Sequence, residues 1–257
     1  MPHKFLLAAL AATTFSAPAF AQDGEPGWSV TVTPRYQQLL FLPDTEADGL
    51  ESMPTYGGTV TVRDPSSRFG ITGTYMQGKA KGVYNYDDGG FSGDYDYNAK
   101  RKELALQGEY TPSETGVTFI AGYHRFSARN NEVLLNPGTG NGEVGRYRQS
   151  VDAAEIGIRI SSRLGADSRH GVSAQFMGGV GNGQTKSTVV ETFGGVSTTT
   201  VKDEKGTGYL GDIALGYNYF VSDNVSIGAR GRGYVFGVSN GDTIFAVAPE
   251  VNMSFRF

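Results

Sequence analysis

The sequence contains no cysteine, which excludes disulfide bonds and the lipid-anchored cysteine of a lipoprotein. Beyond its amino-terminal region it has no apolar run near the roughly 18 residues that a membrane-spanning helix requires. The net charge is −4, so no basic surplus indicates a nucleic-acid partner. What the chain has in quantity is glycine (37 residues), tyrosine (14) and phenylalanine (15), which together favour β-structure over helix.

The first residues have the pattern of a secretory signal peptide. Lys4 precedes the apolar run 5–12, and Ala19 and Ala21 frame an A-x-A cleavage site. The apolar run is too short to span a bilayer. We therefore expect residues 1–21 to be a signal peptide cleaved near Ala21, which leaves residues 22–257 as one exported domain.

The clearest pattern in the chain is strict alternation along residues 243–257. The odd positions carry an apolar face: Phe245, Val247, Pro249, Val251, Met253, Phe255 and Phe257. The even positions carry a small or polar face: Ala246, Ala248, Glu250, Asn252, Ser254 and Arg256. A period of two predicts a β-strand with one apolar and one polar face, and this strand ends on an aromatic residue.

This ending resembles the terminal strand of bacterial outer-membrane β-barrel proteins, whose final phenylalanine is read by the assembly machinery of that membrane. The resemblance covers the last strand closely and the rest of the chain by architecture only, so it implies no narrower family. It implies that Phe255 and Phe257 form an assembly signal and that the barrel-assembly machinery is a partner. It also implies a place in the outer membrane of a Gram-negative bacterium.

Ten strand-like segments can be read along the chain: residues 28–42, 56–63, 69–81, 96–110, 117–128, 151–163, 171–186, 207–220, 225–238 and 243–257. Short polar turns alternate with long loops, and the long loops fall at 43–55, 82–95, 129–149 and 187–206. Short periplasmic turns and long extracellular loops are typical of outer-membrane barrels. We therefore predict that residues 22–257 form an all-β fold, a single transmembrane antiparallel up-and-down β-barrel of about ten strands, with eight or twelve as alternatives.

The aromatic residues indicate which face of this barrel meets lipid. On the apolar parity, one group falls near the short-turn rim: Trp28, Phe69, Tyr110, Phe119 and Tyr219. A second group falls near the long-loop rim: Tyr36, Tyr56, Tyr75, Tyr123, Tyr209 and Phe245. Two aromatic belts flanking an aliphatic band are what two membrane interfaces select. The apolar face is therefore expected to contact outer-membrane lipid and lipopolysaccharide.

The opposite parity then lines the lumen and carries charges of both signs. The predicted polar network consists of Arg101, Glu103, Glu109, Glu155, Arg159, Arg230, Arg232 and Glu250. Two interpretations stay open: ion pairs block the narrow lumen, or the excess of arginine lines a narrow, mildly anion-preferring pore. We expect the first, in which case replacing Arg159 or Arg230 by serine should lower stability and open a water path.

The sequence gives little support for catalysis. His124 is expected in the lumen, whereas His3 lies in the signal peptide and His170 in a short turn. Ser127 follows His124 by three positions, so the two side chains face opposite sides of a strand, unlike the His-x-Ser spacing of outer-membrane lipid A deacylases. Omptin proteases need a histidine near an aspartate at the extracellular rim, which neither His3 nor His170 can supply. We expect no catalytic residue, no metal site and no cofactor.

Two of the long loops carry hairpin patterns. Segment 84–97 is rich in Asp and Tyr around the turn 87–90, without the spacing of an EF-hand. Segment 185–201 alternates around Phe193-Gly194-Gly195 and predicts a second protruding hairpin, whose edges are templates for an added strand. We therefore expect a non-enzymatic protein, structural or adhesive, that binds a surface ligand through its extracellular loops. A narrow porin for small solutes is the alternative, and an enzyme acting on lipid or peptide is the third.

Overall fold

The computed structural model describes residues 28–42, 52–64, 68–88, 91–112, 116–136, 140–165, 169–241 and 243–257. The predicted signal peptide lies outside these residues. The described chain forms ten antiparallel strands: β1 (Ser29–Phe41), β2 (Ser52–Asp64), β3 (Phe69–Asp88), β4 (Phe91–Tyr110), β5 (Val117–Leu135), β6 (Gly142–Leu164), β7 (His170–Phe193), β8 (Val196–Ser222), β9 (Val225–Val238) and β10 (Thr243–Arg256). No helix among the described residues is long and apolar enough to cross a membrane.

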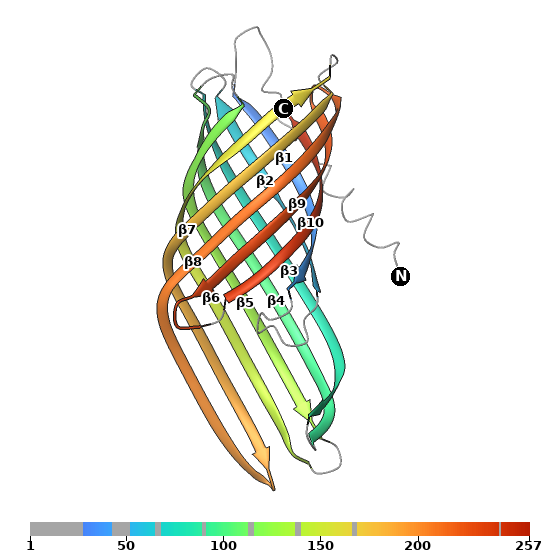
Figure 1. Ribbon diagram of the computed structural model, residues 1–257, viewed down its shortest axis with the longest axis vertical. Coiled ribbons are helices and arrows are strands. Elements are labelled where there is room, and N and C mark those ends of the chain that lie inside the picture. The colour runs from blue at the N-terminus through green and yellow to red at the C-terminus, as the bar shows by residue number, and fades with distance from the viewer. Residues whose placement is uncertain are drawn as a thin grey trace.

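The strands close into a barrel in which each strand pairs with its neighbours in the chain and β1 pairs with β10 (Figure 1). At this seam Val30 N–H donates to Phe257 O at 3.1 Å, and Phe257 N–H donates to Val30 O at 2.8 Å. Closure leaves no strand edge within the barrel, which a lipid environment demands because it offers the backbone no hydrogen bonds. The prediction of one ten-stranded up-and-down barrel is confirmed.

The long strands β3 to β8 run well past the barrel at the end opposite the carboxyl terminus (Figure 1). The prediction of a loop at 129–149 is wrong for most of these residues, which continue β5 and β6. The two predicted hairpins are present: β3 pairs with β4 as far as Asp88 and Phe91, and β7 pairs with β8 as far as Phe193 and Val196. In the second, Gly194 (φ 58°) and Gly195 (φ 82°) join Phe193 to Val196, and two consecutive positive φ values are what a two-residue type I′ turn requires.

The extension is a continuous sheet of β3 to β8. The pairing of β2 with β3 reaches no farther than Gly78, and that of β8 with β9 begins at Gly208. Beyond these points the inner four strands, β4 to β7, stay paired on both sides. Among the described residues, β8 from Val196 to Gly206 pairs with β7 alone. The barrel wall is therefore lopsided, tall on one side and short on the other.

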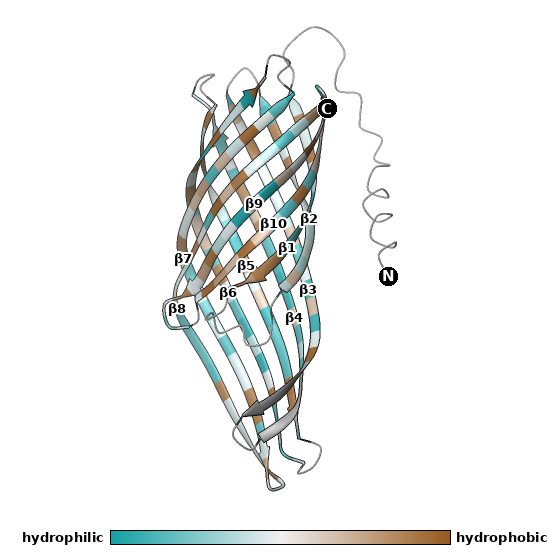
Figure 2. Cartoon of the chain, turned by 45° about the vertical axis from the view of Figure 1, so that its right-hand side comes forward, coloured by the Kyte–Doolittle hydropathy of each residue, from teal (hydrophilic) through white to brown (hydrophobic). Residues whose placement is uncertain are grey.

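The outer face of the barrel is apolar, as predicted from the alternation. Brown hydrophobic positions recur along the barrel wall in Figure 2, whereas the extension is mostly teal and white. The aromatic residues of both predicted belts lie on this outer face, and all but Tyr209, which is half-buried, are exposed. Aliphatic side chains such as Ile156 and Leu215 are exposed between them, 71% and 64% respectively. Such a surface requires lipid as its solvent.

The lipid-facing assignment can be tested on β8, which carries Tyr219 and Tyr209 at the two rims and Leu215 between them. Leu215→Arg should lower the free energy of unfolding by about 2–4 kcal/mol in bilayers, because a charge is placed in hydrocarbon. The control is Val201→Arg on the extension of the same strand, where the 68% exposed side chain should tolerate the charge. Urea titrations of both variants in vesicles measure this difference. Equal costs at the two positions would contradict the assignment.

Candidate functional site

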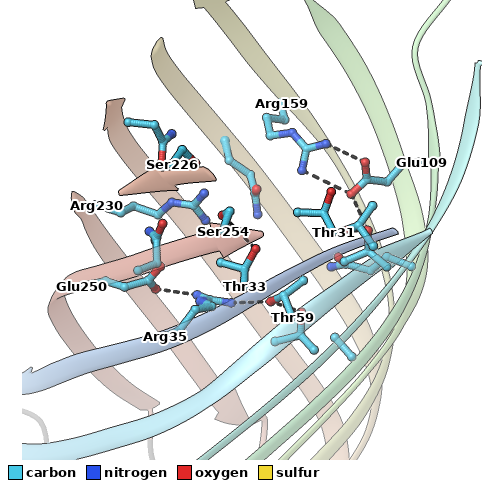
Figure 3. Close-up of a pocket in the computed structure, with 18 of the residues that line it drawn as sticks. Thr31, Thr33, Arg35, Thr59, Glu109, Arg159, Ser226, Arg230, Glu250 and Ser254 are labelled. Carbon is cyan, nitrogen blue, oxygen red and sulfur yellow. Dashed lines mark hydrogen bonds and ion pairs between the residues drawn. The ribbon is translucent and has the colours of Figure 1, made fainter. Parts of the chain in front are cut away.

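The half of the lumen nearer the short-turn rim, which is at the top in Figure 1, holds a polar cavity of about 340 Å³ (Figure 3). Its lining reaches the short-turn rim, where Asp223 and Asn224 of the β8–β9 turn and Arg256 near the carboxyl terminus contribute. The side chains come from the inward parity of the strands, because successive residues of a strand point to opposite faces. The cavity is therefore continuous with the predicted periplasmic rim.

Glu109 on β4 is the most heavily bonded carboxylate of the cavity wall. Arg63 Nη2 and Arg159 Nη2 each donate to Glu109 Oε2 at 2.6 Å, and Arg159 Nη1 donates to Oε1 at 3.2 Å. The Thr72 hydroxyl donates to Oε1 at 2.8 Å. Two guanidinium groups from β2 and β6 thus converge on one carboxylate, and with Thr72 of β3 the resulting cluster joins four strands.

A second cluster lies on the opposite wall, around Glu250 of β10. Arg35 Nη2 donates to Glu250 Oε2 at 2.5 Å and Arg35 Nη1 donates to the Thr59 hydroxyl at 3.3 Å (Figure 3). Arg232 Nη1 lies 3.8 Å from Glu250 Oε2, and Arg232 Nε donates to Asp212 Oδ2 at 2.9 Å. These charges are almost fully buried, so each depends on its partner for the solvation that water would otherwise supply.

His124 on β5 lies in the lumen between two glutamates. Its Nδ1 is 3.0 Å from Glu155 Oε2, and its Nε2 is 3.4 Å from Glu103 Oε1. Gln107 Nε2 donates to Glu155 Oε1 at 2.6 Å. Ser127 is on the outward parity of the same strand, so no Ser–His pair forms with it. His170 begins β7 at the short-turn rim, where its Nδ1 is 2.7 Å from the Tyr217 hydroxyl.

Arg230 differs from the other predicted network residues. Its guanidinium lines the cavity beside Glu250 and Ser226 (Figure 3), but it has no ion-pair partner among the described residues. The facing wall supplies neutral hydroxyl groups. Thr33 and Ser254 are hydrogen-bonded at 2.9 Å, as are Thr59–Thr74 and Thr61–Thr72 at 3.0 Å each. Arg230, like Arg256 at the rim of the cavity, is therefore a cation available to a solute.

The half of the lumen toward the extension is filled mainly by apolar side chains. One buried cluster comprises Leu39, Met53, Ala99, Tyr234, Ala246 and Ala248. A second comprises Phe126, Val151, Ala153, Leu210, Phe236 and Val238. Together they form the closing layer, which draws on β1, β2, β4, β5, β6, β8, β9 and β10. On β1 the cavity lining stops at Arg35, and Leu39 follows four residues farther toward the extension, so the layer lies between the cavity and the extension.

Arg101 of β4 joins the two halves of the closing layer. Its guanidinium carbon lies 4.8 Å from the ring centre of Phe126, 4.9 Å from that of Tyr234 and 5.8 Å from that of Phe236. The two phenylalanine rings contact each other, with 3.9 Å between their centres and 42° between their planes. Arg101 Nη2 donates to Glu103 Oε2 at 2.7 Å, while Nε and Nη1 have no hydrogen-bond partner. The ring faces compensate that charge across the lumen.

The predicted network is thus brought together only in part. Glu109 pairs with Arg159, Arg232 with Glu250, and Arg101 with Glu103, but the last pair comes from one strand and does not span the lumen. Most other partners lie outside the predicted network, although they were expected on the same inward parity: Arg35, Arg63, His124 and Asp212. The closing layer was missed entirely. The available signal was the loss of polar residues on the inward parity near the outer rim, as in Tyr234-Val235-Phe236-Gly237-Val238.

The Glu109 cluster gives a stability prediction. Glu109→Gln removes the charge that two guanidinium groups share and should lower the free energy of unfolding by about 1–3 kcal/mol. The matched control is Glu204→Gln on the exposed extension of β8, which should change stability by less than about 0.5 kcal/mol. Denaturant unfolding in detergent micelles measures both. An equal, small effect of the two substitutions would show that the cluster contributes nothing to stability.

Comparisons with protein-family models and with curated protein sequences found no match. The fold does match solved structures. The outer membrane protease OmpT from Escherichia coli superposes with a TM-score of 0.54 and 11% identity, over 93% of this chain and 99% of that chain. The translocator domain of autotransporter NalP from Neisseria meningitidis gives a TM-score of 0.48 and 10% identity, over 91% and 90%. With its closed ten-stranded barrel and apolar outer face, the chain has the fold of an outer-membrane β-barrel protein.

Proposed function

We propose that this protein is a non-enzymatic outer-membrane barrel that acts at the cell surface, in a structural or adhesive role, through its extended sheet. The observation that carries this proposal is the extension of β3 to β8 beyond the barrel. A barrel that only filled the membrane would need strands no longer than β9 or β10. The strand residues beyond the barrel are not needed to cross the membrane, so we attribute to them a role outside the bilayer.

The β7–β8 hairpin has the surface expected of a contact region. At its tip the apolar side chains of Phe193 and Val196 are 76% and 70% exposed. The threonines at 198–200 follow on the strand, and among the described residues the far edge of β8 is paired with no other strand there. An exposed edge with β-branched residues favours addition of a strand from a partner, since backbone groups supply the affinity.

The interior supports a barrel without an open path. The rings and aliphatic side chains of the closing layer are buried against one another between the cavity and the extension, which supports a closed lumen. A narrow porin is the second candidate, and the polar cavity with the unpaired Arg230 is the observation that favours it. An enzyme is third. The likeness to OmpT lies in the fold alone, and His124 contacts two buried glutamates inside the barrel rather than a residue at the outer rim.

Conductance separates the first two candidates. We expect the refolded wild-type protein to show no steady current in a planar bilayer, because the closing layer is packed. The double substitution Phe126→Ala/Phe236→Ala removes the two contacting rings from the closing layer. It should therefore leave a path for ions and produce discrete channel openings. Arg230→Ser is the control: it alters the cavity but leaves the closing layer intact, so it should stay silent, unlike the expectation from the sequence alone. A large, steady wild-type current would replace this proposal with the porin.

The surface role can be tested by shortening one hairpin. Replacing residues 188–201 by Gly-Gly joins the opposed residues Ser187 and Lys202 by the two-glycine turn that now joins Phe193 and Val196. Bacteria that display the wild-type barrel should attach to epithelial cell layers or to one another, and the shortened variant should lose this gain several-fold. Heat-modifiable migration on gels checks that both barrels are folded at equal levels.

A second variant of the same hairpin controls for its length. Phe193→Ser/Val196→Ser keeps the strands and removes the apolar tip, so it should fall between the wild type and the shortened barrel. Unchanged attachment after shortening would exclude this hairpin as the contact region.

A further inference from the structure

Basic side chains lie directly opposite one another on five neighbouring strands of the extended sheet. Lys79 on β3 opposes Lys100 on β4, which opposes Arg129 on β5. Arg129 opposes Arg148 on β6, which in turn opposes Lys186 on β7. Directly opposed residues share a face, and all five are exposed on the outer one. We call Lys79, Lys100, Arg129, Arg148 and Lys186 the basic ladder.

Few carboxylates offset this charge. At the end of the ladder Lys186 Nζ pairs with Asp203 Oδ2 of β8 at 2.7 Å. The other four members have no ion-pair partner among the described residues. Like charges directly opposite each other destabilise a sheet. The ladder contains four such opposed pairs in a row, so their repulsion adds up. A ladder of this kind is therefore explained by a counter-charge from outside the chain.

The opposite face of the same sheet carries the opposite sign. Glu143 on β6 directly opposes Glu191 on β7, and Glu132 lies on β5 beside them. Burial raises the pKa of Tyr147 to about 12, and the carboxylates of Glu132 and Glu143 add to the rise. The separation of charge is not complete, because Asp96 and Asp203 lie on the outer face and Lys202 on the inner one. At the level of the ladder, however, five basic side chains in a row face outward, whereas Glu132, Glu143 and Glu191 face inward.

The ladder begins where the outer aromatic belt ends. Lys79 lies four residues beyond Tyr75 on β3, about 13 Å along the strand and about 10 Å in height for a tilted strand. Arg129 follows Tyr123 on β5 in the same direction. Since tyrosine rings of such belts lie at the membrane interface, the ladder faces the headgroup layer. Arg129, Arg148 and Lys186 also line a recess of about 410 Å³.

We propose that the basic ladder binds the phosphate groups of phosphorylated lipid headgroups in the outer leaflet and holds the tall side of the barrel against that layer. Guanidinium groups bind phosphate through two parallel hydrogen bonds, and lysines add point charges. The recess places three arginines, Arg146 in addition to Arg129 and Arg148, and Lys186 around one space. The proposal depends on the orientation of the barrel in the membrane and is independent of the adhesive role.

The test compares the ladder with and without its charge. The variant Lys79→Gln/Lys100→Gln/Arg129→Gln/Arg148→Gln removes the four unpaired members, and Arg129→Lys/Arg148→Lys is the matched control that keeps the charge. Full-length barrels in detergent are titrated with diphosphoryl lipid A and with lipid A freed of both phosphates. Binding is followed by native mass spectrometry and by the temperature of unfolding on heat-modifiable gels.

Wild type should bind diphosphoryl lipid A and unfold at a higher temperature in its presence, with no such gain from the dephosphorylated lipid. The four-glutamine variant should bind roughly tenfold or more weakly, and the lysine control should lose far less. Without lipid the glutamine variant should be at least as stable as wild type, because repulsion is relieved. A less stable variant with unchanged lipid binding would assign the ladder a structural role and overturn the proposal.

Two further arms separate the sources of phosphate and the two proposals. A soluble polyphosphate at equal phosphate concentration should compete poorly, and full competition would overturn the assignment to lipid headgroups. The barrel with residues 188–201 replaced by Gly-Gly keeps every ladder residue and should bind diphosphoryl lipid A like wild type. Loss of attachment with retained lipid binding therefore leaves the ladder proposal standing by itself.

Discussion

The structure depends on one constraint: a backbone crossing hydrocarbon must satisfy all of its hydrogen bonds within the protein. Ten strands meet it only when β1 and β10 pair, which makes the sheet continuous around the barrel. Once the sheet is closed, the alternation of side chains assigns every membrane residue to lipid or to lumen. The apolar outer face and the charged inner wall are therefore two results of the same closure rather than separate features.

Inside the barrel, most ion pairs surround the cavity, whereas the buried rings lie nearer the extension, with Arg101 among them. Around the cavity, Glu109, Glu250 and Asp212 hold their cations against the wall, and the space between them remains open. Toward the extension, where the rings of Phe126 and Phe236 contact each other, the inward-facing side chains are apolar and fill the space. The paired charges lie against the wall beside the open space, whereas apolar groups gain by excluding water and meet across the lumen. The barrel is consequently closed by its hydrophobic residues.

The parts of the fold that could be predicted are those where lipid imposes contrast between faces. The ten alternating segments predicted the strand number, and the aromatic residues at the strand ends predicted the two rims and the inward parity of Glu109 and Arg159. Above the membrane both faces of a strand meet water, so segment 129–149 lost that contrast and was predicted as a loop. The closing layer was missed because Phe236 and Val238 are apolar on the parity where polarity was expected. Partners such as Arg63 for Glu109 depend on register across three strands, which a single sequence does not contain.

The seam between β1 and β10 also determines the order in which the barrel can form. The β7–β8 hairpin joins neighbours in the chain through a two-residue turn, so its ladder can grow locally. At the seam, by contrast, Arg35 and Glu250 are separated by 215 positions, and Thr33 and Ser254 by 221. Bringing such distant segments together carries the largest loop-closure entropy in the molecule. We therefore expect the seam to be the last part of the barrel to close, and the Arg35–Glu250 pair to form only at that step.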